Sequence, residues 1–121
     1  MAVSAEQAWQ AVRDFGALHE RLVPGFATAA YLDGGDRVMT FFTGTVLRER
    51  LIALDDVRRR LVWSIIDGPY SHHNGAVEVF ADDDGSCKLV WTADLLPDYA
   101  AQRTSEFMDQ GSRVIKQTLE G

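Results

Sequence analysis

The sequence predicts an α+β fold in which a curved antiparallel sheet of about six strands wraps around a long C-terminal helix. Three observations support this prediction. Apolar residues recur at helical spacing near both ends of the chain. Between these ends lie short runs rich in β-branched and aromatic residues, which are typical of strands. Turns rich in glycine and aspartate separate the runs at short intervals, so successive strands are expected to pair antiparallel.

Two short helices are predicted near the N-terminus. Ser4 is a favourable N-cap, and Gln7 three residues later completes a capping-box pattern. We expect Gly16 to end the first helix, and a short second helix to stop before Pro24. The apolar stripe of the first helix consists of Ala8, Trp9, Val12 and Phe15.

The strands of the predicted meander lie near residues 26–33, 37–43, 45–54, 59–67, 70–82 and 86–96. Turn sequences such as 67–69 and 82–85 separate them. Alternation within the strands indicates one buried face and one solvated face. The apolar positions that share a face are Leu61, Trp63 and Ile65 in one strand and Leu89, Trp91, Ala93 and Leu95 in another.

The last predicted element is a long helix that begins near Pro97 and Asp98. Its apolar stripe needs an apolar partner, and the inner face of the sheet is the surface available to it. The stripe consists of Thr104, Phe107, Met108, Gly111, Val114, Ile115, Thr118 and Leu119.

The bulk properties of the sequence limit its function. We expect one domain spanning residues 1–121, with a core large enough for one cavity. The net charge of -6 disfavours binding to nucleic acid or to an anionic membrane surface. A single cysteine excludes an internal disulfide, and no apolar run approaches the length of a membrane span. We therefore expect a cytoplasmic protein.

Several segments resemble the SRPBCC superfamily, the START-related group that includes the polyketide cyclases/dehydrases and has the helix-grip fold. The similar segments are residues 4–9, 14–16, 46–55 and 59–64. The resemblance implies a cavity between sheet and C-terminal helix that binds a hydrophobic or aromatic small molecule. Two alternatives remain, an enzyme of the cyclase/dehydrase type and a protein-interaction module like the chaperone-ATPase activators. No cofactor is expected.

The chain departs from this family at its beginning. Family members normally have a strand before the first helix, which pairs with the last strand of the sheet. Here only residues 1–3 precede the helix cap, so either the true start of the protein lies upstream or this strand is largely absent. The strand at 86–96 would then have an open edge, which a second copy of the chain could cover in a homodimer.

His73 is the first candidate for a polar group in the cavity. His72 and His73 are adjacent in a predicted strand, so their side chains point to opposite faces. Counting back from Val77 and Val79, which we assign to the core, places His73 in the cavity and His72 outside. His73 could then donate a hydrogen bond to a ligand carbonyl or act as a general acid or base. The alternative is a solvated histidine near the cavity mouth.

Glu49 is the second candidate. If Leu47, Leu51 and Ala53 face inward, Glu49 does so as well and could serve as a base or a ligand anchor. Its strand would lie two strands from that of His73, about 9–10 Å away, so a small ligand could bridge the two side chains. The alternative is a surface glutamate that pairs with Arg48 or Arg50.

The remaining candidates form the walls of the predicted cavity. Trp63 and Trp91 are in phase with the apolar faces of their strands, and Phe107, Met108 and Gly111 would face them from the last helix. A glycine in the middle of a helix indicates either close packing or room for a ligand.

No metal site is predicted. The adjacent histidines and the single cysteine, Cys87, do not have the spacing of zinc ligands. Residues 82–85 lack the spaced oxygen ligands of a calcium loop and are interpreted as a hairpin turn. Cys87 shares the phase of Leu89 and Trp91, so we expect a buried thiol rather than a nucleophile.

Overall fold

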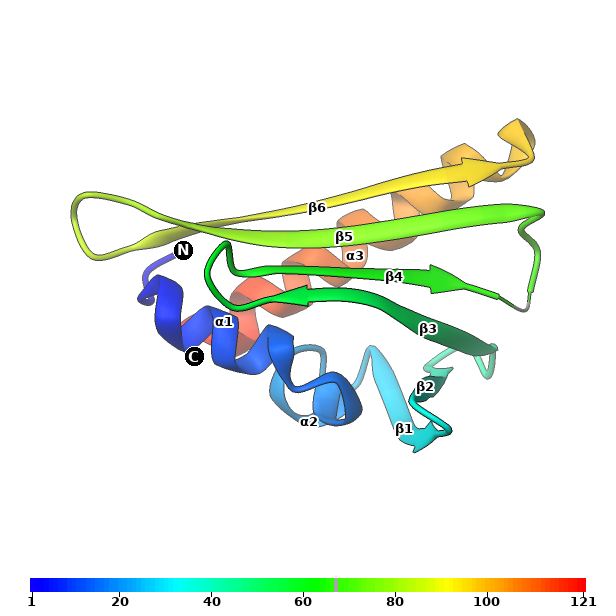
Figure 1. Ribbon diagram of the computed structural model, residues 1–121, viewed down its shortest axis with the longest axis horizontal. Coiled ribbons are helices and arrows are strands. Elements are labelled where there is room, and N and C mark those ends of the chain that lie inside the picture. Colours follow the sequence, from blue (N-terminus) through cyan, green and yellow to red (C-terminus); the bar gives the residue numbers. More distant parts are fainter. Residues whose placement is uncertain (67) are drawn as a thin grey trace.

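A computed structural model describes residues 1–66 and 68–121 and has the predicted α+β architecture (Figure 1). Asp67, which was assigned to the end of a strand and to a turn, lies outside the described residues. The strands are β1 (Ala27–Asp33), β2 (Asp36–Phe41), β3 (Val46–Asp55), β4 (Arg60–Ile65), β5 (His72–Ala81) and β6 (Cys87–Leu96). They form one antiparallel sheet in the order β1-β2-β3-β4-β5-β6.

The helices flank this meander in the chain. They are α1 (Ala5–Arg13), the 3-10 turn η1 (Phe15–Ala17), α2 (Leu18–Arg21), the 3-10 turn η2 (Asp98–Ala100) and α3 (Ala101–Glu120). Helix α3 runs along one face of the sheet, and α1 lies near the C-terminal end of α3 (Figure 1). In the described part of the chain, none of the helices has the length and apolar character needed to cross a membrane.

The N-terminal cap forms as predicted, but the end of the first helix does not. The Ser4 hydroxyl accepts a hydrogen bond from the backbone N–H of Gln7 at 3.1 Å, and the Gln7 side chain accepts one from the N–H of Ser4. Helix α1 ends at Arg13, because Asp14 leaves the helical conformation. Gly16 therefore lies inside η1, and the prediction that it ends α1 is wrong. A Cβ atom on Gly16 would come within 3.1 Å of the Leu32 side chain, so this glycine allows η1 to pack closely on β1.

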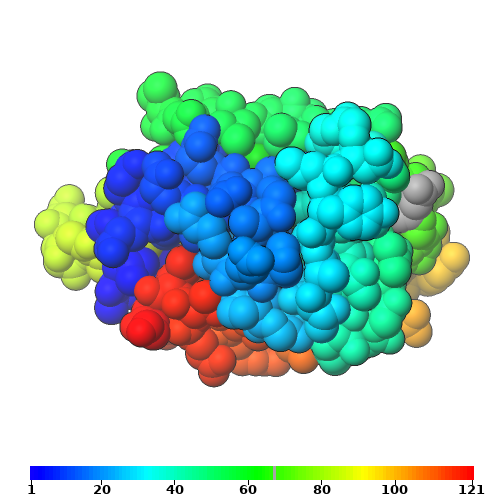
Figure 2. All heavy atoms as spheres, turned by 90° about the horizontal axis from the view of Figure 1, so that it is seen from below, coloured from blue at the N-terminus to red at the C-terminus, as the bar shows by residue number. Residues whose placement is uncertain are grey.

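The core lies between the inner face of the sheet, α3 and the N-terminal helices. Trp9 and Val12 of α1 and Ile115 of α3 are almost completely buried. The side chain of Trp9 also donates a hydrogen bond to Asp56 in the β3–β4 turn at 2.8 Å, which holds α1 against the sheet. Seen from below, the N-terminal helices and the C-terminal end of α3 lie side by side (Figure 2).

A β-bulge changes the expected phase of β3. Leu47 and Glu49 are buried, but the register with β4 shifts between Leu51 and Ala53. Leu51 is 38% exposed and Ala53 is also exposed, so of the three residues that could share the inner face with Glu49 only Leu47 is buried. Beyond the bulge, Leu54 packs against the core instead. In contrast, β5 and β6 pair without interruption from His72 to Ala81.

Close packing of an indole ring on a glycine joins β4 and β5. Trp63 pairs with Gly75 across the two strands. A Cβ atom on Gly75 would lie 2.7 Å from the Trp63 ring, so only glycine leaves the ring its observed position. The neighbouring Ala76 is on the opposite face of β5.

We expect Gly75→Val to lower the free energy of unfolding by about 1–3 kcal/mol, because the added side chain displaces Trp63 from a packed core. Ala76→Val is the matched control, since it adds the same side chain on the outer face and should change stability by less than about 0.5 kcal/mol. Urea denaturation monitored by tryptophan fluorescence measures both values. Equal destabilisation by the two substitutions would contradict this account.

Candidate functional site: a cavity between the sheet and α3

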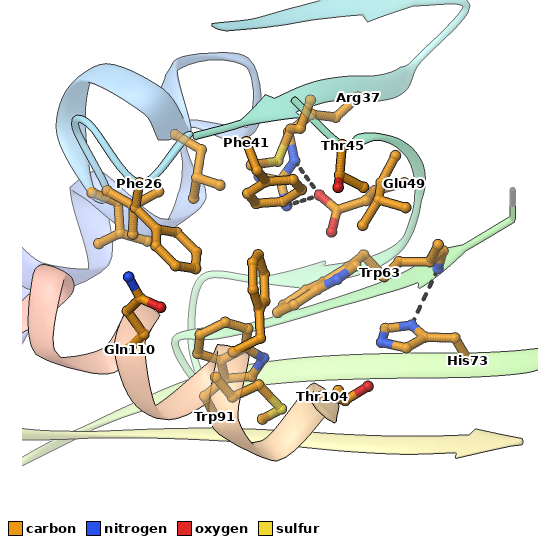
Figure 3. A pocket seen from close by; sticks show the side chains of 18 of the residues that line it. Phe26, Arg37, Phe41, Thr45, Glu49, Trp63, His73, Trp91, Thr104 and Gln110 are labelled. Carbon is orange, nitrogen blue, oxygen red and sulfur yellow. Dashed lines mark hydrogen bonds and ion pairs between the residues drawn. The ribbon is translucent and has the colours of Figure 1, made fainter. Parts of the chain in front are cut away.

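A cavity of about 530 Å³ separates the inner face of the sheet from α3 (Figure 3). This volume lies within the range of small-molecule binding sites, roughly 300–1,000 Å³. Where the cavity meets solvent, its lining includes exposed residues of the β2–β3 loop and of α3, namely Phe42, Thr43, Thr45, Arg103, Glu106 and Gln110.

Two groups of aromatic rings form part of the cavity walls. Phe107 of α3 lies 4.6 Å from Phe26 and 4.9 Å from Phe41 between ring centroids. Trp63 and Trp91 form a second pair, with centroids 6.4 Å apart. Rings at these distances and tilts contribute favourable aromatic contacts and leave flat apolar surface facing the cavity. The lining is therefore suited to a planar apolar molecule.

Six of the seven sequence-predicted ligand residues line this cavity, namely Glu49, Trp63, His73, Trp91, Phe107 and Met108. The seventh, Gly111, is buried but is not among the lining residues. A Cβ atom on Gly111 would lie 3.0 Å from the Trp91 ring and 3.3 Å from Phe26. Close packing of α3 on the sheet, rather than room for a ligand, therefore accounts for this glycine.

A buried ion pair, which the sequence analysis missed, lies in the cavity wall. The Arg37 side chain is 2% exposed, and its Nε and Nη2 atoms donate to Glu49 Oε1 at 2.8 and 2.7 Å. Arg37 also donates to the backbone carbonyl of Phe15 at 3.2 Å, and its guanidinium lies 4.0 Å from the centroid of that ring. Arg37 is in phase with Met39 and Phe41 in β2. This alternation could have indicated from the sequence that Arg37 faces inward.

The surface alternative for Glu49 is thus excluded. Arg48 and Arg50 extend from the opposite face of β3 and pair with Asp36, at 3.0 and 3.2 Å. These two guanidinium groups hold the pKa of Asp36 below its usual value. Glu49 instead faces inward, where its buried charge is balanced by Arg37.

His73 also faces the cavity, as the phase of Val77 and Val79 predicts, and His72 is exposed. Its Nδ1 atom accepts a hydrogen bond from the backbone N–H of Ile65 at 3.2 Å. In the neutral imidazole the proton must therefore be on Nε2. Burial, with a smaller contribution from the charge of His72, lowers the pKa of His73 from 6.5 to about 4.

The polar groups of the cavity lie in one row across the sheet. Arg37 of β2 is directly opposite Glu49 of β3, and Glu49 is opposite Ile65 of β4. Ile65 in turn donates to His73 of β5. Glu49 and His73 are therefore two strands apart at the same level, with Cα atoms separated by about 10 Å at normal strand spacing.

A hydrogen bond of 2.7 Å between the hydroxyl groups of Tyr70 and Thr104 connects the segment before β5 to the first turns of α3. The Tyr70 ring also lies 5.0 Å from the imidazole of His73 between centroids. Both residues line the cavity, so this contact connects α3 to the sheet side at the end of the cavity away from Gly111.

The other candidate groups lie away from the cavity. Cys87 is 1% exposed and absent from the lining, and burial raises the pKa of its thiol, as expected for a structural cysteine. Residues 82–85 form the β5–β6 turn. Within residues 1–66 and 68–121, no three side chains of the metal-ligating types gather closely enough to hold an ion.

The lowered pKa of His73 predicts a pH-dependent stability. The unfolded chain binds a proton at His73 near pH 6.5, whereas the folded protein does so only near pH 4. Stability from this group is therefore complete above about pH 7 and is lost as the pH falls to 4, by up to about 3 kcal/mol. The difference in unfolding free energy between wild type and His73→Asn should shrink over this range.

Asparagine at position 73 can still accept the Ile65 hydrogen bond but does not titrate. Urea denaturation from pH 7 to about pH 4.5 gives the comparison. His72→Asn is the control, because His72 is exposed and its replacement should preserve most of the wild-type pH profile. A difference between wild type and His73→Asn that stays constant with pH would disprove this assignment.

Comparisons with known proteins agree with the observed fold. The family described as polyketide cyclase / dehydrase and lipid transport matches residues 1–120. A solved structure from Thermobifida fusca is 32% identical with a TM-score of 0.75, and the match covers 92% of this chain and 79% of that one. An uncharacterised protein from Bacillus thuringiensis is 21% identical with a TM-score of 0.84, and here 98% and 93% of the two chains are covered.

A third structure is a point mutant of norcoclaurine synthase from Thalictrum flavum in complex with a transition-state analogue. It is 20% identical with a TM-score of 0.66, and the match covers 98% of this chain and 89% of that one. At this identity the likeness concerns the fold alone. No curated protein sequence matches significantly. From the family match over almost its whole length, this chain belongs to the polyketide cyclase/dehydrase and lipid transport family of the SRPBCC superfamily.

Proposed function

We propose that this protein binds one hydrophobic or aromatic small molecule in the cavity between the sheet and α3. The observation that supports this most strongly is a cavity of about 530 Å³ lined mainly by aromatic and aliphatic side chains. Buried sites of this kind hold ligands by apolar contact, and a few polar groups orient them. The proposed contacts are Phe26, Phe41, Glu49, Trp63, His73, Trp91, Phe107 and Met108.

Binding is favoured over cyclase-type catalysis because of the state of the polar groups. With a pKa near 4, His73 is uncharged at neutral pH and carries no proton that it could readily release as an acid. Glu49 is held in an ion pair with Arg37. One oxygen of Glu49 still faces the cavity, so it would be the base in a catalytic alternative. Turnover of an aromatic ketone that Glu49→Gln abolishes without weakening binding would favour that alternative.

A neutral fluorescent dye, N-phenyl-1-naphthylamine, tests the binding proposal. We expect one molecule to bind per chain with increased fluorescence, because the dye leaves water for an apolar site. Met108→Trp should weaken dye binding about tenfold or more, since the indole occupies cavity volume. Arg113→Trp, on the exposed face of α3, is the matched control and should leave the affinity unchanged.

Dye fluorescence titration and native mass spectrometry of the purified protein measure affinity and stoichiometry. Absence of binding to the wild-type protein, or equal affinity in the two tryptophan variants, would refute binding in this cavity.

We further propose that β6 pairs with β6 of a second copy. The backbone groups of Cys87 point away from β5 and bond to Met1, at 2.6 and 3.1 Å. By the alternation of an antiparallel ladder, the N–H and C=O groups of Leu89, Trp91 and Ala93 point the same way. Among the described residues they have no hydrogen-bond partner. Such an edge is a template for a further strand.

Charge supports one register for this pairing. A two-fold axis at Trp91 puts Leu89 opposite Ala93 of the second copy and allows these edge groups to bond reciprocally. On the exposed face, Lys88 then lies opposite Asp94 in both directions. Pairing centred on Thr92 instead places Asp94 opposite Val90, so neither of the two pairs between Lys88 and Asp94 can form.

This register predicts a charge-reversal pattern. Lys88→Asp should weaken dimerisation about tenfold, because it places two carboxylates opposite each other twice. The double variant Lys88→Asp/Asp94→Lys should restore the wild-type affinity. Sedimentation equilibrium measures the dissociation constants. A wild-type protein that remains monomeric at millimolar concentration, or a double variant no better than the single one, would refute this dimer.

A further inference from the structure

We propose that the cavity selects uncharged aromatic molecules with a hydroxyl group at one end, bound by Glu49, and a carbonyl group at the other, bound by His73. This inference rests on the proposed binding function and adds the chemical class of the ligand. It follows from the hydrogen-bonding capacity that the protein leaves unused at each end of the polar row.

At one end of the row, Glu49 offers only an acceptor. Both bonds from Arg37 converge on Oε1, so they leave Oε2 without a partner among the described residues. Figure 3 shows this second oxygen directed away from Arg37. An ion-paired carboxylate accepts hydrogen bonds and cannot donate them. A ligand group that satisfies Oε2 must therefore be a donor, such as a hydroxyl group.

At the other end, His73 offers only a donor. The backbone N–H of Ile65 occupies Nδ1, and this places the imidazole proton on Nε2. Within the part of the chain that the structure describes, Nε2 has no hydrogen-bond partner, and the side chain lines the cavity. A ligand group that satisfies Nε2–H must be an acceptor, such as a carbonyl oxygen.

The spacing of the two groups sets the size of the ligand. Glu49 and His73 lie at the same level of the sheet on strands two apart, about 10 Å between Cα atoms. Both side chains line the cavity, and the Glu49 carboxylate contacts Arg37, which is on the strand farther from His73. A donor and an acceptor at opposite ends of a two-ring aromatic system fit this span. Trp63 and Phe107 supply the aromatic surfaces beside it.

The net charge of the wall favours an uncharged ligand. The charges of Arg37 and Glu49 cancel within one ion pair. His73 is neutral at pH 7 because its pKa is about 4. A charged ligand would therefore lose its hydration without gaining a counter-charge from this row, and such a transfer is strongly unfavourable.

Matched naphthalene probes test this inference by isothermal titration calorimetry. The probe with both groups is 6-hydroxy-2-acetonaphthone. In 6-methoxy-2-acetonaphthone the donor is masked, and in 6-hydroxy-2-naphthoic acid the ketone is replaced by a carboxylate. We expect the hydroxy ketone to bind about tenfold tighter than either analogue, the typical effect of one hydrogen bond to a charged group or of an unpaired charge.

A double variant shows whether Glu49 is responsible. Arg37→Met/Glu49→Met removes the ion pair without leaving a lone buried charge, and the affinity ratio of hydroxy to methoxy ketone should fall to about one. The control is Arg60→Met/Glu78→Met, which removes an ion pair of 3.4 Å on the outer face of β4 and β5 and should keep the wild-type ratio. His73→Asn should weaken binding of both ketones while the ratio between them persists.

The outcomes separate the two proposals. If neither N-phenyl-1-naphthylamine nor any of the naphthalene probes binds, the proposed function fails and this inference fails with it. If the dye binds but the hydroxy ketone does not, only this inference is overturned. If the probes bind but wild type does not distinguish hydroxy from methoxy ketone, only the present inference is overturned. The same holds if the double variant at Arg37 and Glu49 keeps the wild-type preference.

Discussion

The close contact of α3 with the sheet at Gly111 determines where the interior is filled and where it is open. Because Gly111 has no side chain, the Trp91 and Phe26 rings approach the helix backbone, and the C-terminal half of α3 packs into the core through Ile115. Toward its N-terminus α3 is connected to the sheet side by Thr104 and Tyr70. Side chains between these two contacts, including Phe107, line a cavity instead of a packed core.

The buried ion pair places a hydrogen-bond acceptor at one end of the cavity. Burying a single charge in an apolar wall is strongly unfavourable, but the charges of Arg37 and Glu49 balance each other, and the carbonyl and ring of Phe15 also contact the guanidinium. Arg37 donates to only one oxygen of Glu49, so the pair adds an acceptor to the cavity without adding net charge. The neutral His73 adds a donor in the same row.

The open edge of β6 and the cavity are two consequences of one topology. The meander places β1 and β6 at the edges of the sheet, and α3 follows directly after β6. The same strand therefore contributes Trp91 to the interior and, at the edge, backbone groups that have no partner within residues 1–66 and 68–121. Pairing of a second copy at this edge would involve the backbone of Trp91, whose side chain lines the cavity. The proposed dimer and the proposed binding site therefore share this residue.

Local sequence signals determined the order and nearly all the boundaries of the helices and strands. The capping box at Ser4, the turns and the period-two alternation act between neighbours in the chain, so they can be read without knowing the fold. Alternation also identified His73 as the inward histidine, because β5 carries no bulge. The family resemblance predicted the cavity, but not the arrangement of hydrogen-bond donors and acceptors in its wall.

Features that depend on contacts between distant residues became clear from the three-dimensional structure alone. Glu49 was ambiguous from sequence because its partner, Arg37, is on another strand, and cross-strand register brings the two together. The bulge after Leu51 is likewise a feature of the pairing with β4, and the close approach of Gly16 to Leu32 is a contact between η1 and β1. Alternation along each strand limits which residues can face inward, whereas the register of the sheet selects which of them meet, since pairing across strands is a long-range choice.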